Sequence, residues 1–393
     1  MADNGASTMG HPDGGGRREH GREEEGGASA GRPTRENGRE EAGRASAGGA
    51  MRENGREEAG RASAGGAMRE NGREEAGRAS AGGAMRENGE MRREDGEVRY
   101  RSEEAMRGDG LPPMRLVHAD DIAAAVARLC MEANYDLGDD TVAALRFGLN
   151  KEASETGKDV LQLLLDNAEL AAAERVPMCQ DTGMAVVIAE VGHDCRIVGG
   201  TLQEAIQAGV RQGYREGYLR SSIALHPFRR VNTGDNTPAV IHTELVPGDR
   251  LKLKLTAKGG GSENMSALRM LKPSDGLEGA IDFVLDTVRI AGPNACPPLV
   301  VGVGIGGSFE KCALLAKTAL FRPVGERSGD AEIAALEEEL LARINRLGIG
   351  PQGMGGRVTA LDVKINVHPC HIASLPVAVN LNCHANRHKE AVL

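Results

Sequence analysis

Seven cysteines are the residues of this 393-residue chain that could most plainly carry chemistry. No two of them form a C-x-x-C pair, so the chain has no zinc-ribbon, ferredoxin or thioredoxin-type motif. Three cysteines stand in segments where proline or a second polar side chain adjoins the thiol, and proline stiffens a loop. They are Cys179 in Val176-Pro-Met-Cys-Gln-Asp-Thr-Gly183, Cys296 in Gly292-Pro-Asn-Ala-Cys-Pro-Pro298 and Cys383 in Asn382-Cys-His-Ala-Asn-Arg-His388.

Three separated thiolates fit a [4Fe–4S] cluster whose fourth iron stays open to a substrate oxygen. From the residues alone, a Cys–His nucleophile and plain structural thiols are equally good interpretations. Cys130 and Cys312 lie in apolar helical runs, so we expect both to be buried small hydrophobic side chains. Cys195 lies in a short polar connection and has no assigned role, whereas Cys370 competes with Cys383 for the third ligand position.

The motifs around these cysteines resemble the α subunit of class I fumarate hydratases and L-tartrate dehydratases. Each motif alone is weak, but together they are specific and run in family order from about Leu116 to His388. The motifs are Cys179-Gln-Asp-Thr-Gly183, Asn232-Thr-Gly-Asp-Asn-Thr-Pro238, Lys258-Gly-Gly-Gly-Ser-Glu-Asn264, Ala295-Cys-Pro-Pro298, Gly302-Val-Gly-Ile-Gly-Gly307 and Asn382-Cys-His-Ala385.

The resemblance implies that Cys179, Cys296 and Cys383 hold the [4Fe–4S] cluster. It also implies a hydro-lyase that hydrates fumarate to L-malate, a step of the tricarboxylic acid cycle, or dehydrates tartrate to oxaloacetate. We favour fumarate because that activity is the more common, although no residue discriminates the two. Because the chain stops soon after Cys383, we expect a separate β subunit to complete the site in a hetero-oligomer. A cluster-bearing regulatory subunit without turnover and an iron-independent Cys–His thiol hydrolase are the alternatives from other classes.

The resemblance also suggests substrate contacts. A dicarboxylate needs cationic donors, and Arg220 is the candidate because a guanidinium binds a carboxylate through two parallel hydrogen bonds. Gln180 and Asp181 directly follow the first ligand, and we expect them to contact the substrate, with Asp181 placed for proton transfer. A loop aspartate that caps its own turn is the alternative for Asp181. Gly234 and Gly261 belong to motifs whose backbone could approach the substrate closely.

The resemblance also implies an active-site histidine, and His371, 12 residues before Cys383 (383 minus 371), is the candidate. Because histidine titrates near neutral pH, it could orient or protonate the leaving group. A structural histidine is the alternative.

The glycine run 302–307 is neither G-x-G-x-x-G nor a P-loop, so we expect it to cradle the cluster loop or a substrate carboxylate. His384, Arg387 and His388 could tune the cluster or contact the partner.

Hydrophobic periodicity predicts the elements that must position these residues. Asp120 and Asp121 are expected to cap the first helix. Since helices and strands do not alternate regularly, the fold class should be α+β, with the motifs in loops. The predicted helices are 122–133, 140–149, 160–173, 202–213, 277–291, 310–320 and 331–347, and the predicted strands are 185–191, 239–245, 251–257, 299–303 and 359–367.

Residues 1–110 have a different composition from the rest, without Cys, Trp, Phe, Leu or Ile. A 17-residue Arg/Glu/Gly-rich unit repeats within them, so we expect a disordered tail followed by a hydro-lyase α domain over residues 111–393. The net charge of −9 and the 2% aromatic content argue against binding to nucleic acid. No apolar run is long enough for a membrane span, and cysteines without a secretion signal favour the cytoplasm.

Overall fold

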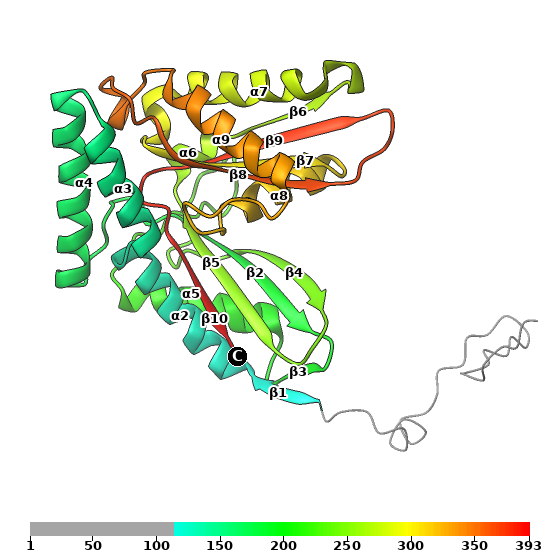
Figure 1. Cartoon of the computed structure of the whole chain (residues 1–393). Helices are drawn as coiled ribbons and strands as arrows, with labels where there is room; N and C mark the ends of the chain where they lie inside the picture. Colours follow the sequence, from blue (N-terminus) through cyan, green and yellow to red (C-terminus); the bar gives the residue numbers. More distant parts are fainter. Residues whose placement is uncertain (1–113) are drawn as a thin grey trace, which may run out of the picture. The chain divides into compact units, whose positions relative to one another are not determined.

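The computed structural model describes residues 114–393, so the tail expected over residues 1–110 lies outside the described part of the chain. The described residues form two four-stranded sheets, a two-stranded sheet and the helices that cover them (Figure 1). Parallel and antiparallel neighbours mix within both large sheets, which confirms the α+β class. No helix in this part of the chain is long and apolar enough to cross a membrane.

The first large sheet has the strand order β10-β5-β2-β4. Strand β2 (Met184–Gly192) runs parallel to β4 (Val240–Val246) and antiparallel to β5 (Leu251–Lys258), and β10 (His388–Val392) pairs with the free edge of β5. In β5, Leu251, Leu253 and Leu255 are fully buried and alternate with half-buried lysines, as the period-2 pattern predicts.

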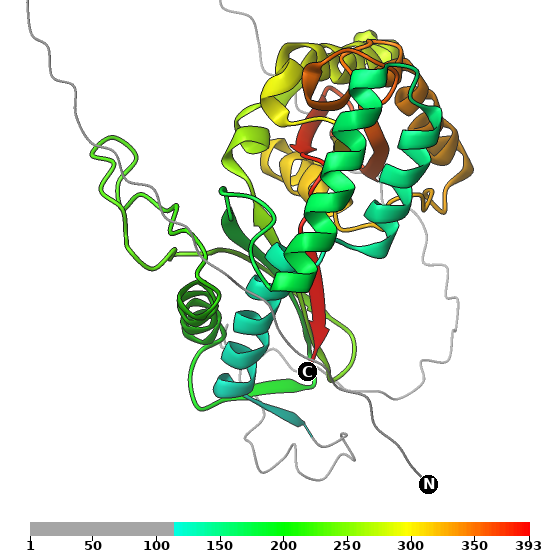
Figure 2. The ribbon, with the colours of Figure 1, turned by 90° about the vertical axis from the view of Figure 1, so that its left-hand side faces the viewer.

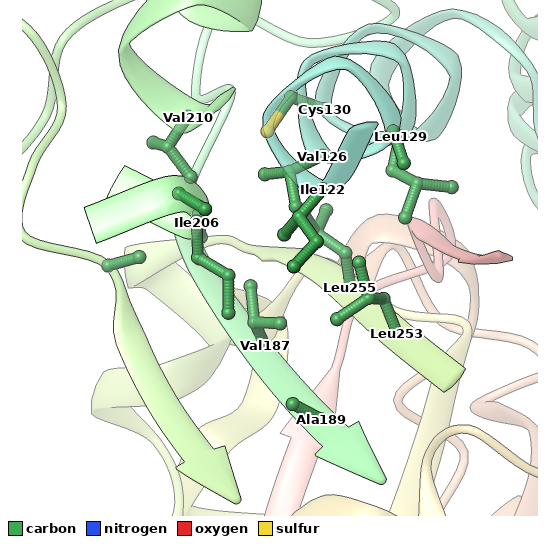
Figure 3. Packing of buried hydrophobic residues seen from close by; sticks show 14 of the residues in the cluster. Ile122, Val126, Leu129, Cys130, Val187, Ala189, Ile206, Val210, Leu253 and Leu255 are labelled. Atoms are coloured by element: carbon green, nitrogen blue, oxygen red, sulfur yellow. The ribbon is translucent and has the colours of Figure 1, made fainter. Parts of the chain in front are cut away.

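Helices α2 (Ala119–Tyr135) and α5 (Leu202–Glu216) bury their apolar faces on this sheet. Figure 3 shows Ile122 and Val126 of α2 meeting the side chains of β2 and β5. The two helices approach closely because α5 has glycine at the crossing; a Cβ on Gly209 would lie 2.5 Å from the Ala123 carbonyl oxygen. Cys130 is fully buried in this core, as predicted.

The second large sheet has the order β6-β9-β7-β8. Its central strand β7 (Leu299–Gly306) runs parallel to β8 (Ala360–His368) and antiparallel to β9 (Leu375–Asn382), and β6 (Ala267–Leu271) is the edge strand beyond β9. Helices α7 (Gly276–Ala291) and α9 (Ala331–Asn345) share one apolar core with this sheet.

Helix α8 (Phe309–Ala319) packs directly on β7, and the glycine run allows it to do so. A Cβ on Gly302 would lie 2.2 Å from the Ala316 carbonyl oxygen, and one on Gly304 would lie 2.0 Å from that of Cys312. The run therefore makes room for a helix. It does not cradle the cluster loop or a substrate carboxylate, because α8 covers it. Cys312 is buried, as predicted.

The remaining elements connect or flank the two sheets. Helices α3 (Asp139–Lys151) and α4 (Glu155–Glu174) form a pair whose small core includes Val358. The others are the parallel pair β1 (Arg115–His118) and β3 (Cys195–Val198), the short helix α6 (Gly260–Asn264), and 3₁₀ turns at Pro273–Asp275, Gly292–Ala295 and Pro351–Gly353.

All seven predicted helices and all five predicted strands are present, with small shifts at their ends. The predicted cap of the first helix is wrong. The helix begins at Ala119, with His118 in an extended conformation at the N-cap, so Asp120 and Asp121 lie in its first turn. The chain enters the helix straight from β1, which fixes the start earlier, and the two carboxylates still favour the positive end of the helix dipole.

Candidate functional site

The three predicted ligand cysteines lie in loops that meet between the two large sheets. Cys179 precedes β2 of the first sheet, Cys296 precedes β7 of the second, and Cys383 lies on the passage from β9 back to β10. Burial raises the pKa of the Cys296 thiol, and the nearby Cys383, Cys179 and Asp181 raise it further. Groups from three distant parts of the sequence are therefore close enough to repel one another electrostatically when charged.

The Cys296 loop is held by polar contacts to two other segments. The cysteine ends a 3₁₀ turn with φ 55°, and its N–H donates to the Pro293 carbonyl at 3.0 Å. Gln352 donates to the Pro297 carbonyl from both its backbone (2.8 Å) and its side chain (2.9 Å). The Gln352 amide nitrogen also lies 3.2 Å from Nδ1 of His384, whose pKa burial lowers to about 4.

Asp181 ties the first ligand loop to the glycine motif. Its Oδ1 accepts the Gly183 N–H at 3.0 Å, which is the turn-capping bond expected of a loop aspartate. Its Oδ2 accepts the Gly260 N–H at 2.8 Å, from the start of α6. A carboxylate has about four lone-pair positions, so both oxygens can still accept another hydrogen bond. The capping and catalytic interpretations of Asp181 are therefore compatible.

Arg220 and Gln180 are both exposed beside this loop. Arg220 is placed by its backbone, because the Thr182 hydroxyl accepts its N–H at 2.9 Å and donates to its carbonyl at 3.0 Å. The side chain of Gln180 accepts a weak bond of 3.4 Å from the Cys179 thiol. Both side chains are therefore open to solvent, and the Arg220 backbone is fixed to Thr182, the residue after Asp181.

The motif that contains Gly234 packs against the same place. Gly234 has φ 86°, a conformation that favours glycine, and its N–H donates to the Asn232 side chain at 2.7 Å. Asn236, fully buried, accepts the Ser222 N–H at 2.7 Å and donates to the Gly183 carbonyl at 3.2 Å. The geometry of this corner therefore depends on Asn236, which joins the Gly234 loop to the Asp181 turn.

Gly261 lies where α6 approaches the Cys296 loop. A Cβ at this position would come within 3.3 Å of the Asn294 carbonyl oxygen. A Cβ on Gly259 would meet Nη2 of Arg387 at 3.2 Å and Oδ2 of Asp181 at 3.3 Å. The expected close backbone approach is present, although one of the amides, that of Gly260, is already used by Asp181.

A buried ion cluster below α6 was not predicted from the sequence. The Lys258 ammonium is almost completely buried and contacts the Leu381 carbonyl (2.8 Å), the Ser262 hydroxyl (2.9 Å) and Glu263 (3.2 Å). Burial lowers the pKa of Lys258 to about 8, while Glu263 opposes that shift. Glu263 also pairs with Lys317 of α8 at 2.7 Å, so the cluster fixes α6 against β9 and α8.

His371 does not join this site within one chain. It is exposed in the turn between β8 and β9, and β9 then runs from Leu375 to Asn382 before Cys383 is reached. Seven steps along a strand cover roughly 23 Å. Within one chain, the extended strand β9 therefore keeps His371 away from Cys383, and the catalytic role expected of His371 stays a prediction. Cys370 lies in the same turn, so it does not compete with Cys383.

The potential metal donors of this site are thiols that come from three separate loops. Among residues 114–393 no three His, Cys, Asp or Glu side chains are close enough together to hold one metal ion. Three thiols from separate loops that face a common space are the ligand set of a cluster with one iron free of protein ligands. All seven cysteines are free of disulfide bonds, so the three thiols are available.

Comparisons with known proteins agree on one family. The family model described as fumarate hydratase (fumerase) matches residues 123–392. A Methanocaldococcus jannaschii protein named "Putative L(+)-tartrate dehydratase subunit alpha" is 44% identical over 275 residues, which is 68% of this chain and 95% of the relative. The proteins named L(+)-tartrate dehydratase subunit alpha of Escherichia coli strains UTI89 and K12 are 36% and 35% identical over 266 residues, 67% of this chain and 87% of each relative.

Proposed function

This chain belongs to the fumarate hydratase (fumerase) family of hydro-lyases, and we propose that it is the α subunit of a [4Fe–4S]-dependent enzyme that hydrates fumarate reversibly to L-malate. The convergence of Cys179, Cys296 and Cys383 on one space is the observation that carries the proposal. These three thiolates would hold the cluster. When bound, the cluster supplies a Lewis acid for the carbon–oxygen bond that is made or broken.

The other residues of the site would bind and orient the dicarboxylate. Arg220 is exposed and firmly placed by Thr182, so its guanidinium can hold one carboxylate. The exposed amide of Gln180, next to Asp181 in the chain, would add a polar contact, and Gly234 and Gly261 would let the backbone approach without a side chain in the way. Together they would fix the substrate before proton transfer, which is where much of an enzyme's rate enhancement arises.

Asp181 would exchange a proton with the substrate hydroxyl. The two backbone N–H groups that it accepts hold the carboxylate in one orientation, and each oxygen keeps a lone pair for the substrate hydroxyl. Dehydration also removes a proton from the carbon next to a carboxylate, and no residue of this chain is assigned that task. We expect the principal base to come from the β subunit.

His371 could act at the proposed site only if it came from another chain. The resemblance assigns it to the active site, yet about 23 Å of strand separates it from Cys383 in the same chain. A second copy of the chain would have to bring its exposed turn to the site. The histidine would then orient or protonate the leaving group, as its side-chain chemistry allows.

A separate β subunit is supported by the names of the relatives, each of which is a subunit alpha. The exposed position of Arg220 and Gln180 also leaves room for further catalytic groups. We place the enzyme in the cytoplasm, because its seven free cysteines suit a reducing compartment.

L-Tartrate dehydration is the second candidate reaction, and the names of the relatives favour it. An anaerobic assay with malate, fumarate and tartrate distinguishes the two. The chain is reconstituted with iron and sulfide and assayed with and without the protein encoded beside its gene. Turnover that needs both chains and disappears in air supports the proposal and identifies the substrate. A fully loaded cluster without turnover on any of the three would favour a regulatory subunit, and full turnover without iron would favour a thiol hydrolase.

A further inference from the structure

A projecting segment between α5 and β4 exposes large apolar side chains next to the site. We call residues 218–231 the projecting hairpin; Figure 2 shows it standing away from the sheets. Tyr218 is 92% exposed, Leu225 72%, Phe228 89% and Val231 60%. Single exposed apolar residues are common on any protein, but a cluster within 14 residues marks a surface that another molecule covers.

The projecting hairpin is held in shape by its own hydrogen bonds. Three backbone contacts close it: Leu225 N–H to the Val231 carbonyl at 2.7 Å, Thr233 N–H to the Ile223 carbonyl at 2.9 Å, and Arg230 N–H to the His226 carbonyl at 3.0 Å. The rings of His226 and Phe228 lie 5.8 Å apart at its tip. Because the backbone is already ordered with its apolar groups turned outward, a partner would lose little conformational entropy on binding it.

The base of the projecting hairpin is continuous with the candidate site. Arg220 is bonded through its backbone to Thr182, next to Asp181. The Ser221 hydroxyl donates to the Gly234 carbonyl at 3.1 Å. A molecule that covers the apolar tip would therefore also lie over the open side of the site, where the missing catalytic groups must enter.

The charge of the projecting hairpin adds to its specificity. Arg229 and Arg230 are exposed beside Phe228, and neither forms an ion pair with any residue between 114 and 393. Aromatic and arginine side chains are the residue types enriched at the centres of protein interfaces. Two free guanidinium groups would attract a partner surface with carboxylates around an apolar pocket.

We propose that the projecting hairpin is the docking surface for the β subunit, with Phe228 and Leu225 entering an apolar pocket and Arg229 and Arg230 meeting carboxylates on its rim. The inference rests on the proposed two-subunit enzyme and adds where the subunits meet. It commits to the β subunit because that partner has to supply the principal base, which no residue of this chain is assigned, at the site that the hairpin borders. A second copy of the chain and a general apolar surface are the competing occupants.

The test compares Phe228→Ser with Ile290→Ser, a matched control that changes another highly exposed apolar residue, on α7. Binding of the protein encoded beside the gene is measured by calorimetry with the iron-loaded full chain. We expect Phe228→Ser to weaken binding at least about 10-fold, as for an interface hot spot, and Ile290→Ser to change it less than about 2-fold. Charge reversal at Arg229 and Arg230 should lower the association rate and its dependence on salt.

Two further readouts separate this inference from the proposed function. Iron and sulfide content of the variants alone should equal that of the natural chain, which shows that the fold and the cluster loops are intact. If Phe228→Ser no longer binds the protein encoded beside the gene, the docking surface is supported. This conclusion does not depend on whether the natural pair shows turnover. If Phe228→Ser binds as well as the natural chain, or if it changes only self-association seen by light scattering, the inference is overturned.

Discussion

The buried guanidinium of Arg387 donates to the backbone carbonyl of Asp181, 206 residues earlier in the chain. The same nitrogen donates to the Asn134 side chain at 2.9 Å, and Arg387 is only 5% exposed. Met178 in turn donates its N–H to the Asn134 carbonyl at 3.0 Å. One side chain therefore positions the first ligand loop on both sides of Cys179, from the segment that also carries Cys383.

Arg387→Lys should lower kcat without removing the cluster. A lysine keeps the charge, but its side chain is shorter and its ammonium should not reach the position of Nη1, which contacts both acceptors, so the Asp181 turn should shift by a fraction of an ångström. Misplacement on that scale costs about 10- to 100-fold in rate. The measurement is steady-state kinetics with parallel iron analysis. Arg128→Lys, on the exposed face of α2, is the control and should be silent; an unchanged kcat in Arg387→Lys would refute the positioning role.

Each of Cys179→Ser, Cys296→Ser and Cys383→Ser should lose or disable the cluster and abolish turnover. Cys312→Ser and Cys370→Ser are the matched controls, because one thiol is buried under β7 and the other lies at the far end of the second sheet. Iron content and the visible absorption of the reconstituted chain give the result. Full cluster content in Cys383→Ser would mean that the ligand set is wrong.

Glu152 should make the stability of the fold depend on acid pH. Burial raises the pKa of its carboxyl, but backbone N–H bonds from Ser154, Arg357, Val358 and Ala153 outweigh burial and hold the pKa below its usual range. A lowered pKa stabilises the fold above the unfolded-state value of about 4.3, and that contribution is lost as pH falls through the folded-state pKa.

Glu152→Gln should therefore cost about 1–3 kcal/mol at pH 7, since part of the loop Arg357–Val358 loses its acceptor. The difference from the natural chain should shrink when urea unfolding is repeated below about pH 4. Glu155→Gln, at the exposed start of α4, serves as the control. An equal difference at both pH values would show that ionisation of Glu152 does not stabilise the fold.

Gly304→Ala should destabilise the chain strongly, whereas it should not change substrate affinity in the molecules that remain folded. The new Cβ would lie 2.0 Å from the Cys312 carbonyl, so β7 and α8 would have to separate. Overpacking of this kind costs about 1–3 kcal/mol or more. Thermal unfolding and KM are the two measurements. A stable variant with a raised KM would contradict this prediction and would indicate that the glycine run binds substrate.

Deletion of residues 1–110 should leave turnover nearly unchanged. We propose that this repeated, charge-balanced segment is a tether, and none of the residues assigned to the site falls within it. The anaerobic assay on the shortened chain checks this, with iron content as the control for correct folding. A collapse in rate with the cluster still present would give the tail a direct role.

Local sequence patterns were sufficient for most helices and strands but not for the pairing of distant segments. Strand β9 is absent from the predicted strands although all but the first of its residues are buried; Pro376, which cannot donate a ladder hydrogen bond, weakens the local strand pattern at its start. Strand β10, His-Lys-Glu-Ala-Val, is polar and has strand character only through its pairing with β5. Such edge strands depend on tertiary contacts rather than on local propensity.

The candidate site shows the same limit: local patterns identify motifs but not the contacts between distant segments. Cysteines and glycines in motifs could be identified from their neighbours in the chain, and the three ligand loops do meet. Arg387 was ranked low, and Gln352 and Lys258 were missed as positioning residues, since each acts on a segment that only the fold brings near. For His371 the sequence gives no distance: only 12 residues separate it from Cys383, but eight of them form the extended strand β9 (Leu375–Asn382).

The second sheet is inserted between two strands of the first, because the chain leaves after β5 and returns at β10. The candidate site lies where the chain passes from one sheet to the other, after β5 and again before β10. Its residues are therefore synthesised at widely separated times. Cys383 follows Cys179 by 204 residues (383 minus 179). At about 5–20 residues per second, a ribosome needs roughly 10–40 s to make that stretch. Throughout that interval the first thiol lacks at least one of its two proposed partners, so assembly of the proposed cluster has to follow translation of the inserted sheet.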